Sequence, residues 1–370
     1  MRTSSLPRAA VLPAALAVAL ACGACGAANE SSAGTGDAGS GQNLSGDLKG
    51  AGASTQKVAQ DAWIAKFTGK NQNVSMSYSP IGSGGGRQRF IEGATAFGGT
   101  DEALTGGELA KARKRCGGVL IEAPVYISPI AMSYNVKGVD DLRLTPQAAA
   151  KIFTGKITNW NDPAIAKTNP AANLPDQPIT PVHRSDESGT SGNFTDYLSG
   201  AAGGAWTYGD TETWPSKLKG ESAQGTSGVV KVVKQTPGAI TYADASQVRS
   251  DPSLGTAKVK VGNEYVGPSP KAAAKILADS KQTGTKDKYV FTYDLNRKTS
   301  ASGTYPVVLA SYELACGKYD SAGQAKAVRA YLDYITSPQG QRLAAEQAGS
   351  APIPSTLRQE VSPAIESISG

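Results

Sequence analysis

The sequence predicts an α/β protein that folds into two lobes, each with its own core. Segments with strand-like and helix-like patterns alternate along most of the chain, which is typical of an α/β protein with mainly parallel sheets. The 325 residues that follow position 45 (370 minus 45) are enough to bury two cores. No internal sequence repeat is present, so a repeat architecture is not expected.

The alternation can be followed from the amino terminus onward. In 55–67, Val58, Ala62 and Ala65 recur at helical spacing, whereas residues 73–78 alternate in the manner of a strand. The other expected strands cover 44–52, 119–134, 179–183 and 237–242. The other expected helices cover 87–92, 145–153, 188–198, 228–235 and 325–335.

The amino terminus has the composition of a secretory signal peptide, which we place at residues 1–21. Arg2 and Arg8 supply a positive start, and a mostly apolar run over 9–21 follows them. This run is shorter than the about 20 residues that a membrane-spanning helix needs. We therefore expect the protein to be exported.

A cysteine directly follows the expected cleavage point, which suggests lipid attachment. Cys22 has Leu20 and Ala21 before it, whereas Cys25 has only Gly23 and Ala24, so Cys22 is the expected acylated residue and Cys25 the alternative. A plain secretory signal with incidental cysteines is the other interpretation. The stretch 22–45 is rich in Gly, Ser and Ala, which predicts a flexible tether.

Charge and histidine content argue against several classes of function. The formal net charge is +6, and Lys and Arg are spread along the chain, whereas nucleic-acid binding needs a clustered basic face. The only histidine, His183, would have to serve any zinc site or Ser-His-Asp triad by itself. No Gly-Lys pair is followed by Ser or Thr, so a P-loop is absent. We expect no nucleic-acid partner, no metal, no cofactor and no catalytic residue.

Two cysteines remain beyond the expected tether, Cys116 and Cys316. An even number of cysteines in an exported domain predicts a disulfide. Two separate buried thiols are the alternative.

Three short turns share one design, in which glycine and hydroxyl residues separate an expected strand from an expected helix. They lie at 50–55, 82–86 and 185–192. Such a turn places hydroxyls and unpaired N–H groups at the positive end of a helix, where anions bind. Any one turn alone is compatible with ordinary helix capping. Three of them, with the planar cation Arg184 beside the third, indicate an anion site.

Four motifs, in this order, resemble the ligand loops of the PstS phosphate-binding family. They are Gly50-Ala-Gly-Ala-Ser54, Ile81-Gly-Ser-Gly-Gly85, Phe97-Gly-Gly-Thr-Asp101 and Arg184-Ser-Asp-Glu-Ser-Gly-Thr190. The stretches 152–162 and 237–242 support the resemblance, which covers nearly the whole chain after the tether. It implies a periplasmic-binding-protein-like fold of type 2, in which two crossover strands join two α/β lobes and the ligand lies between them.

The resemblance also implies roles for individual residues. The expected phosphate-binding set comprises Ser54, Thr55, Ser83, Asp101, Arg184, Ser188, Gly189 and Thr190. Asp101 would accept a hydrogen bond from a protonated phosphate oxygen, and Asp186 would orient Arg184. The family often has Phe where this chain has Thr55, so the packing at that position is left open.

Lobe boundaries follow from the same resemblance. Lobe one is expected to contain 46–129 and 303–370, and lobe two 130–302, with crossings near 127–131 and 304–309. Cys116 and Cys316 then both belong to lobe one, which makes their pairing geometrically feasible.

The resemblance thus implies a monomeric lipoprotein on the extracytoplasmic face of the cell membrane. It would bind inorganic phosphate tightly and deliver it to the permease and ATPase subunits of an ABC importer. A receptor for sulfate or molybdate is the alternative among binding proteins, and Asp101 argues against it because a carboxylate facing a fully deprotonated anion pairs two acceptors. A secreted phosphatase and an adhesin without a small ligand are the alternatives from other classes.

Overall fold

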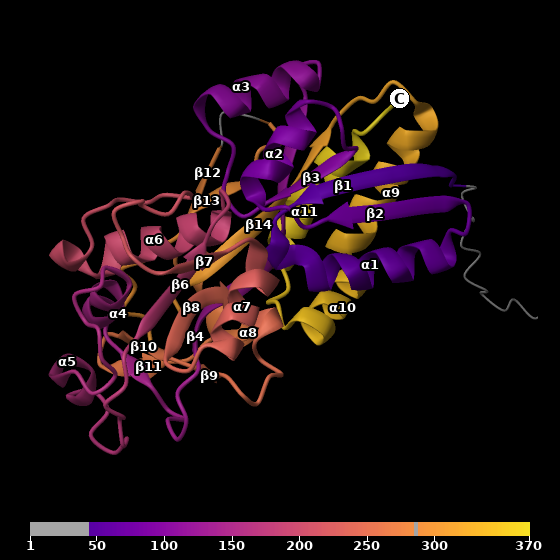
Figure 1. The fold of residues 1–370 in the computed structure, drawn as a ribbon. Coiled ribbons are helices and arrows are strands. Elements are labelled where there is room, and N and C mark those ends of the chain that lie inside the picture. Colours follow the sequence, from indigo (N-terminus) through magenta and orange to yellow (C-terminus); the bar gives the residue numbers. More distant parts are fainter. Residues whose placement is uncertain (1–43, 285–287) are drawn as a thin grey trace, which may run out of the picture. The chain divides into compact units, whose positions relative to one another are not determined.

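The computed structural model describes residues 44–284 and 288–370. The predicted signal peptide, both candidate acylated cysteines and nearly all of the predicted tether lie outside these ranges. The main sheet of the described part runs, in spatial order, β2 (Val74–Ser79), β1 (Gly46–Gly52), β3 (Phe97–Thr100), β14 (Val308–Cys316), β4 (Leu120–Tyr134), β8 (Ala239–Asp244), β6 (Thr180–Arg184) and β7 (Glu221–Ala223) (Figure 1). A ninth strand, β9 (Gly255–Thr256), pairs with β4.

Parallel pairing is confined to the two outer parts of this sheet. Strand β1 pairs in parallel with β2 and β3, and β6 pairs in parallel with β7 and β8. We call β1, β2 and β3 the first half, and β6, β7 and β8 the second half. Between them, β14 is antiparallel to β3 and β4, and β4 is antiparallel to β8. The prediction of mainly parallel pairing is therefore wrong at the centre, because the chain passes out along β4 and returns along β14.

Strand β4 connects the two halves without interruption. Its residues 120–129 pair with β14, and its residues 130–134 pair with β8. Every residue of β4 and of β14 is buried, as expected for strands covered on both faces. The predicted crossing at 127–131 falls within β4, and the one at 304–309 ends at the first two residues of β14.

Helices flank both halves of the sheet (Figure 1). Those packed around the first half are α1 (Lys57–Lys70), α2 (Ser83–Ile91), α3 (Gly106–Arg115), α9 (Ala322–Thr336), α10 (Pro338–Ala348) and α11 (Ser355–Glu366). Those around the second half are α4 (Pro146–Phe153), α6 (Gly189–Ala201), α7 (Gly225–Gln235) and α8 (Pro270–Ala278). Shorter elements are α5 (Pro163–Ala166), a small sheet of β5 (Arg143–Leu144), β10 (Lys258–Val261) and β11 (Glu264–Val266), and the pair β12 (Lys281–Thr283) and β13 (Thr292–Asp294).

Helix starts follow local sequence signals. Thr145 accepts a hydrogen bond from Ala148 N at 3.0 Å and is followed by proline at the first position of α4. Ser337 accepts one from Gly340 N at 3.1 Å before the proline that opens α10. A hydroxyl cap followed by proline satisfies one orphan N–H and removes another. All predicted strands and helices are present, with bounds that shift by at most four residues.

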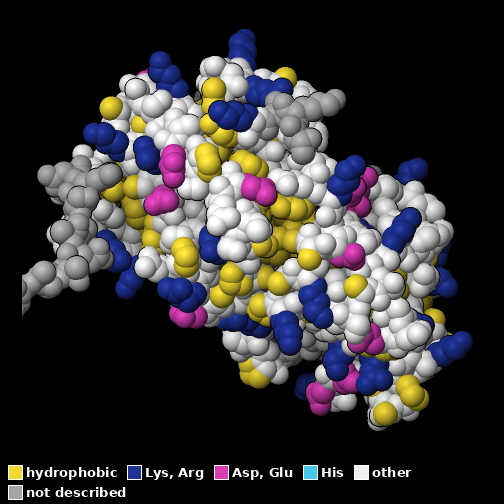
Figure 2. Space-filling model, turned by 180° about the vertical axis from the view of Figure 1, so that it is seen from behind, with side chains coloured by type: hydrophobic (Ala, Val, Ile, Leu, Met, Phe, Trp, Pro, Cys, Tyr) yellow, Lys and Arg dark blue, Asp and Glu magenta, His cyan; other side chains and the backbone are white. Residues whose placement is uncertain are grey.

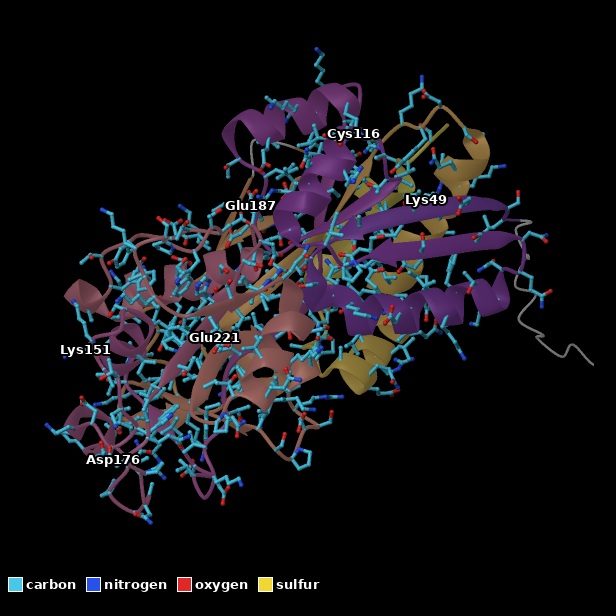
Figure 3. All side chains as sticks on the ribbon, viewed as in Figure 1. Lys49, Cys116, Lys151, Asp176, Glu187 and Glu221 are labelled. Atoms are coloured by element: carbon cyan, nitrogen blue, oxygen red, sulfur yellow. A yellow bond between two sulfur atoms is a disulfide. The ribbon has the colours of Figure 1, made fainter. Side chains whose placement is uncertain are left out.

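Cys116, directly after α3, and Cys316, the last residue of β14, form a disulfide (Figure 3). The bridge confirms the predicted pairing and closes a loop of 200 positions. A loop of this length corresponds to about 5 kcal/mol in chain-entropy models, and measured values are typically about 2–4 kcal/mol.

We expect the double variant Cys116→Ala/Cys316→Ala to lose about 2–5 kcal/mol of unfolding free energy, because its unfolded chain is no longer constrained. Urea denaturation with and without reductant provides the measurement. The reductant should destabilise the wild type to the level of the double variant and leave the double variant unchanged. A wild type that is equally stable in both conditions would refute a stabilising disulfide.

Candidate anion-binding site

Four helical segments begin close together at the carboxyl ends of the parallel strands. They are the 3₁₀ turn Ser54–Gln56 that leads into α1, and the helices α2, α6 and α7. Ser54 Oγ lies 3.0 Å from Thr226 Oγ1, which joins the starts of α1 and α7. Gly84 N donates to Glu187 O at 3.3 Å, which joins the starts of α2 and α6. Several positive helix ends therefore face one point between the two halves, as anion binding requires.

All eight residues of the predicted set are buried around this point. Ser54 and Thr55 lie in the 3₁₀ turn, Ser83 opens α2, Asp101 follows β3, Arg184 ends β6, Ser188 caps α6, and Gly189 and Thr190 open α6. The structure thus brings the whole set together. One of them has a more local role than expected, because the Ser188 hydroxyl accepts from Ser191 N at 3.3 Å and so caps α6.

The Asp101 carboxylate is the only acidic group of that set, and hydroxyl groups surround it. It accepts hydrogen bonds from Ser311 Oγ at 2.6 Å, Thr55 Oγ1 at 2.8 Å and Thr190 Oγ1 at 3.3 Å. Burial raises the pKa of Asp101, and the hydrogen bonds from Ser311 and Thr55, followed by the charge of Arg184, oppose the rise. All three donors are distant in sequence, so the side chain does more than cap its own turn.

The structure defines the packing of Thr55, which the sequence had left open. Its side chain is fully buried and donates to Asp101, so a hydroxyl occupies the position where the family often has an aromatic ring. Thr55 thereby contributes one of the hydrogen bonds to the central carboxylate.

Arg184 supplies a fixed positive charge. Its side chain is 2% exposed, and Nε and Nη2 donate to the two oxygens of Asp186 at 2.8 and 2.5 Å. This two-point contact fixes the plane of the guanidinium and leaves Nη1 within 3.4 Å of Thr190 Oγ1. Asp186 also accepts from Gly225 N at 3.1 Å, which ties the pair to the start of α7.

Gly189 is required by a close approach of the two halves. A Cβ atom at this position would lie 2.7 Å from Asp101 Cβ and 2.8 Å from Ser83 Oγ. No side chain fits there without displacing those residues. The start of α6 therefore lies directly against the first half of the sheet.

Sequence reasoning missed two residues of this cluster, Thr226 and Ser311. Thr226 N and its hydroxyl both contact Ser54 Oγ at 3.0 Å. The sequence could have indicated Thr226, because the segment 225–228 (Gly-Thr-Ser-Gly) has the same combination of glycine and hydroxyl residues as the three other turns. Ser311, in the middle of β14, has no local signal, since only the pairing of β14 with β3 and β4 brings it to Asp101.

The single histidine takes part in packing beside this site. The His183 ring stacks on Trp214 with centroids 5.1 Å apart, and Nδ1 lies 2.9 Å from Arg184 O. Burial lowers the pKa of His183. Within residues 44–284 and 288–370, no group of three or more His, Cys, Asp or Glu side chains is placed to hold a metal ion.

The distribution of surface charge and the hydropathy of the helices are relevant to nucleic-acid and membrane partners. Basic side chains are interspersed with acidic and uncharged ones on the face shown in Figure 2. In the described part of the chain, no helix is both long and apolar enough to cross a membrane.

Comparison with known proteins relates the chain to phosphate-binding proteins. The model of the PBP superfamily domain matches residues 30–339. Phosphate-binding protein PstS2 of Mycobacterium bovis is 34% identical over 364 residues, which cover 97% of each chain.

Two solved structures share the fold. One is a putative phosphate ABC transporter substrate-binding protein from Clostridium perfringens with bound phosphate (21% identity, TM-score 0.60, 84% of this chain and 100% of that one). The other is a high-affinity periplasmic phosphate-binding protein bound with phosphate (19% identity, TM-score 0.70, 86% of this chain and 93% of that one). At these identities the likeness concerns the fold, which agrees with the two-lobed architecture expected from the sequence.

Proposed function

The chain belongs to the PstS family of phosphate-binding proteins, and we propose that it binds inorganic phosphate outside the cytoplasm and delivers it to an ABC importer. One observation carries the proposal: hydroxyls, helix N-termini and Arg184 converge on a point where Asp101 is the only carboxylate of the predicted set, since Asp186 is already bound by Arg184 and Gly225 N. Donors alone would suit any oxyanion. One acceptor among many donors suits an oxyanion that still carries a proton.

The proposed ligand contacts follow from this arrangement. Hydroxyl and backbone donors of Ser54, Thr55, Ser83, Gly189 and Thr190 would contact the phosphate oxygens, with Ser188 at the start of α6 alongside them. Arg184, held by Asp186, would neutralise the charge of the ligand. Asp101 would accept the remaining phosphate proton. Two structures of the same fold, each with bound phosphate, support phosphate as the ligand but not the individual contacts.

Isothermal titration tests the proposal directly. The protein, freed of phosphate, is titrated with phosphate, arsenate and sulfate at neutral pH. Saturable binding of phosphate and arsenate with one site is expected, and sulfate is expected to give no binding heat. A protein that binds sulfate but not phosphate would instead be the receptor for another tetrahedral oxyanion.

We further propose that the chain acts as a monomer without metal, cofactor or catalytic step, and passes phosphate unchanged to the permease and ATPase subunits. Relatives that carry the name of a binding protein support the non-enzymatic role. The lobes proposed for this function are 46–129 with 303–370, and 130–302.

The proposed location is the extracytoplasmic face of the cell membrane, with the lipid on Cys22. Each buried methylene of an acyl chain contributes about 0.8 kcal/mol to membrane binding, so removal of the chains should release the protein. We expect Cys22→Ala to appear in the soluble fraction after cell fractionation, while Cys25→Ala stays with the membrane. The reverse pattern would identify Cys25 as the acylated residue.

A further inference from the structure

Arg87, in the middle of α2, is the centre of an ion cluster outside the anion site. Its side chain is 2% exposed and contacts three glutamates. Nε donates to Glu108 at 2.8 Å, Nη2 to Glu187 at 2.8 Å, and the two terminal nitrogens to Glu212 at 2.9 and 2.6 Å. We call these four residues the Arg87 ion cluster.

The partners of Arg87 come from both halves of the sheet. Glu108 lies in α3, which follows β3 of the first half. Glu187 lies between β6 and α6, and Glu212 lies between α6 and β7, so both belong to the second half. Figure 3 places Glu187 where α2 meets the start of α6. Two of the three ion pairs therefore cross from one half to the other.

The cluster adjoins the anion site without being part of it. Arg87 lies one helical turn after Ser83 in α2, and Glu187 directly precedes Ser188. Backbone hydrogen bonds also connect the cluster to the site. Gly84 N, next to Ser83, donates to Glu187 O at 3.3 Å, and Ser188 N donates to Glu212 O at 3.1 Å. Closure over an anion and assembly of the cluster therefore require the same approach of α2 and α6.

Only some contacts of the cluster depend on the approach of α2 and α6. If the halves separate, Arg87 keeps Glu108 and its contact to Thr100 Oγ1 (3.2 Å), but loses Glu187 and Glu212. The two-point contact with Glu212 is the geometry in which an arginine and a carboxylate bind most strongly. Burial lowers the pKa of the Arg87 guanidinium, but Glu212, with Glu108 and Glu187, raises it overall. The closed arrangement therefore gains charge-assisted hydrogen bonds that the open one lacks.

We propose that Arg87, Glu187 and Glu212 form a closing contact that stabilises the closed state and thereby sets how long the bound anion is retained. This inference rests on the proposed phosphate-binding function and concerns its regulation. None of these residues is among the proposed ligand contacts, so their effect is on opening rather than on recognition.

Dissociation kinetics test the proposal. We expect Glu212→Gln to raise the dissociation rate constant of phosphate about tenfold, which corresponds to about 1.4 kcal/mol, and to change the association rate constant less than threefold. The matched control is Glu108→Gln, which removes a carboxylate from the same guanidinium within the first half. Its dissociation rate constant should not rise. Stopped-flow chase experiments provide the measurement, and circular dichroism with thermal unfolding confirms that the variants fold.

A ligand-independent measurement separates this inference from the proposed function. Small-angle X-ray scattering of the anion-free proteins should give a larger radius of gyration for Glu212→Gln than for the wild type and Glu108→Gln. Should Glu212→Gln fail to fold, Glu187→Gln takes its place. A wild type that does not bind phosphate overturns the proposed function, whereas unchanged scattering and an unchanged dissociation rate overturn the closing contact. An equal rise in Glu108→Gln shows a packing role only.

Discussion

Arg184→Ala is expected to weaken phosphate binding by two to four orders of magnitude, and Ser188→Ala by about tenfold or less. Arg184 is the only cation in the proposed set, and its loss leaves both the anion and Asp186 without their buried counter-charge. Breaking a buried ion pair from one side costs about 3–5 kcal/mol, and each 1.4 kcal/mol is a factor of ten in affinity.

Ser188 provides the contrast, because its hydroxyl already accepts a hydrogen bond from Ser191 N and caps α6. A neutral hydrogen bond contributes only about 0.5–1.5 kcal/mol. Arg184→Lys keeps the charge but loses the two-point contact with Asp186, so its affinity should fall between those of the wild type and Arg184→Ala. Isothermal titration of the folded variants decides the order. Equal losses at positions 184 and 188 would place Arg184 outside the site.

Asp101 is expected to decide which anion binds, so that the wild type takes phosphate and arsenate but rejects sulfate. Phosphate groups titrate near neutral pH, with a pKa of about 6 for phosphoesters, so inorganic phosphate can still donate a proton to a carboxylate. Sulfate has no such proton, and the buried carboxylate would face it as a second acceptor. Selectivity of this kind comes from a penalty on the wrong ligand.

Asp101→Asn should therefore reduce the phosphate-to-sulfate affinity ratio by at least tenfold, because an amide NH₂ can donate to a sulfate oxygen. Ser311→Ala is the matched control. It removes one donor to Asp101 (2.6 Å) but keeps the carboxylate, so the ratio should stay near that of the wild type. Titrations with both anions at neutral pH give the ratios. Sulfate binding by the wild type, or an unchanged ratio in Asp101→Asn, would show that Asp101 is not the selector.

Local signals explain which parts of the fold were predicted. The helix starts at Thr145 and Ser188 follow from hydroxyl caps that act within a few residues, whereas α2 begins at Ser83, four residues before its predicted start, and has no side-chain cap. Strand β3 was missed because two of its four residues are glycines, which have low strand propensity. Neighbouring atoms leave no room for a larger residue in this strand, since a Cβ at Gly99 would lie 2.3 Å from Tyr78 Oη. Only tertiary contacts make this segment a strand.

The site shows the same limit. Motifs on contiguous segments predicted residues that the structure brings together, because three of the four motifs join a strand end to a helix start and the fourth is the end of strand β3. Ser311 was missed because it meets Asp101 across 210 positions, and Glu187 and Glu212 were missed because they meet Arg87 across 100 and 125 positions. Such pairings depend on how the two halves approach each other, which no local pattern specifies.

The disulfide also limits how these halves can move. The Cys116–Cys316 bridge fastens β14 at the end where Leu120 pairs with Cys316, and the ladder continues to Val308 opposite Pro129. The bridge and the long ladder of hydrogen bonds both oppose sliding of β14 along β4, so shear between these strands is not expected. Opening must instead bend both strands beyond the last rung, where Ile130 N donates to Val307 O at 2.7 Å. The molecule is therefore expected to work as a hinge whose axis lies at that rung, with the first half as its fixed arm.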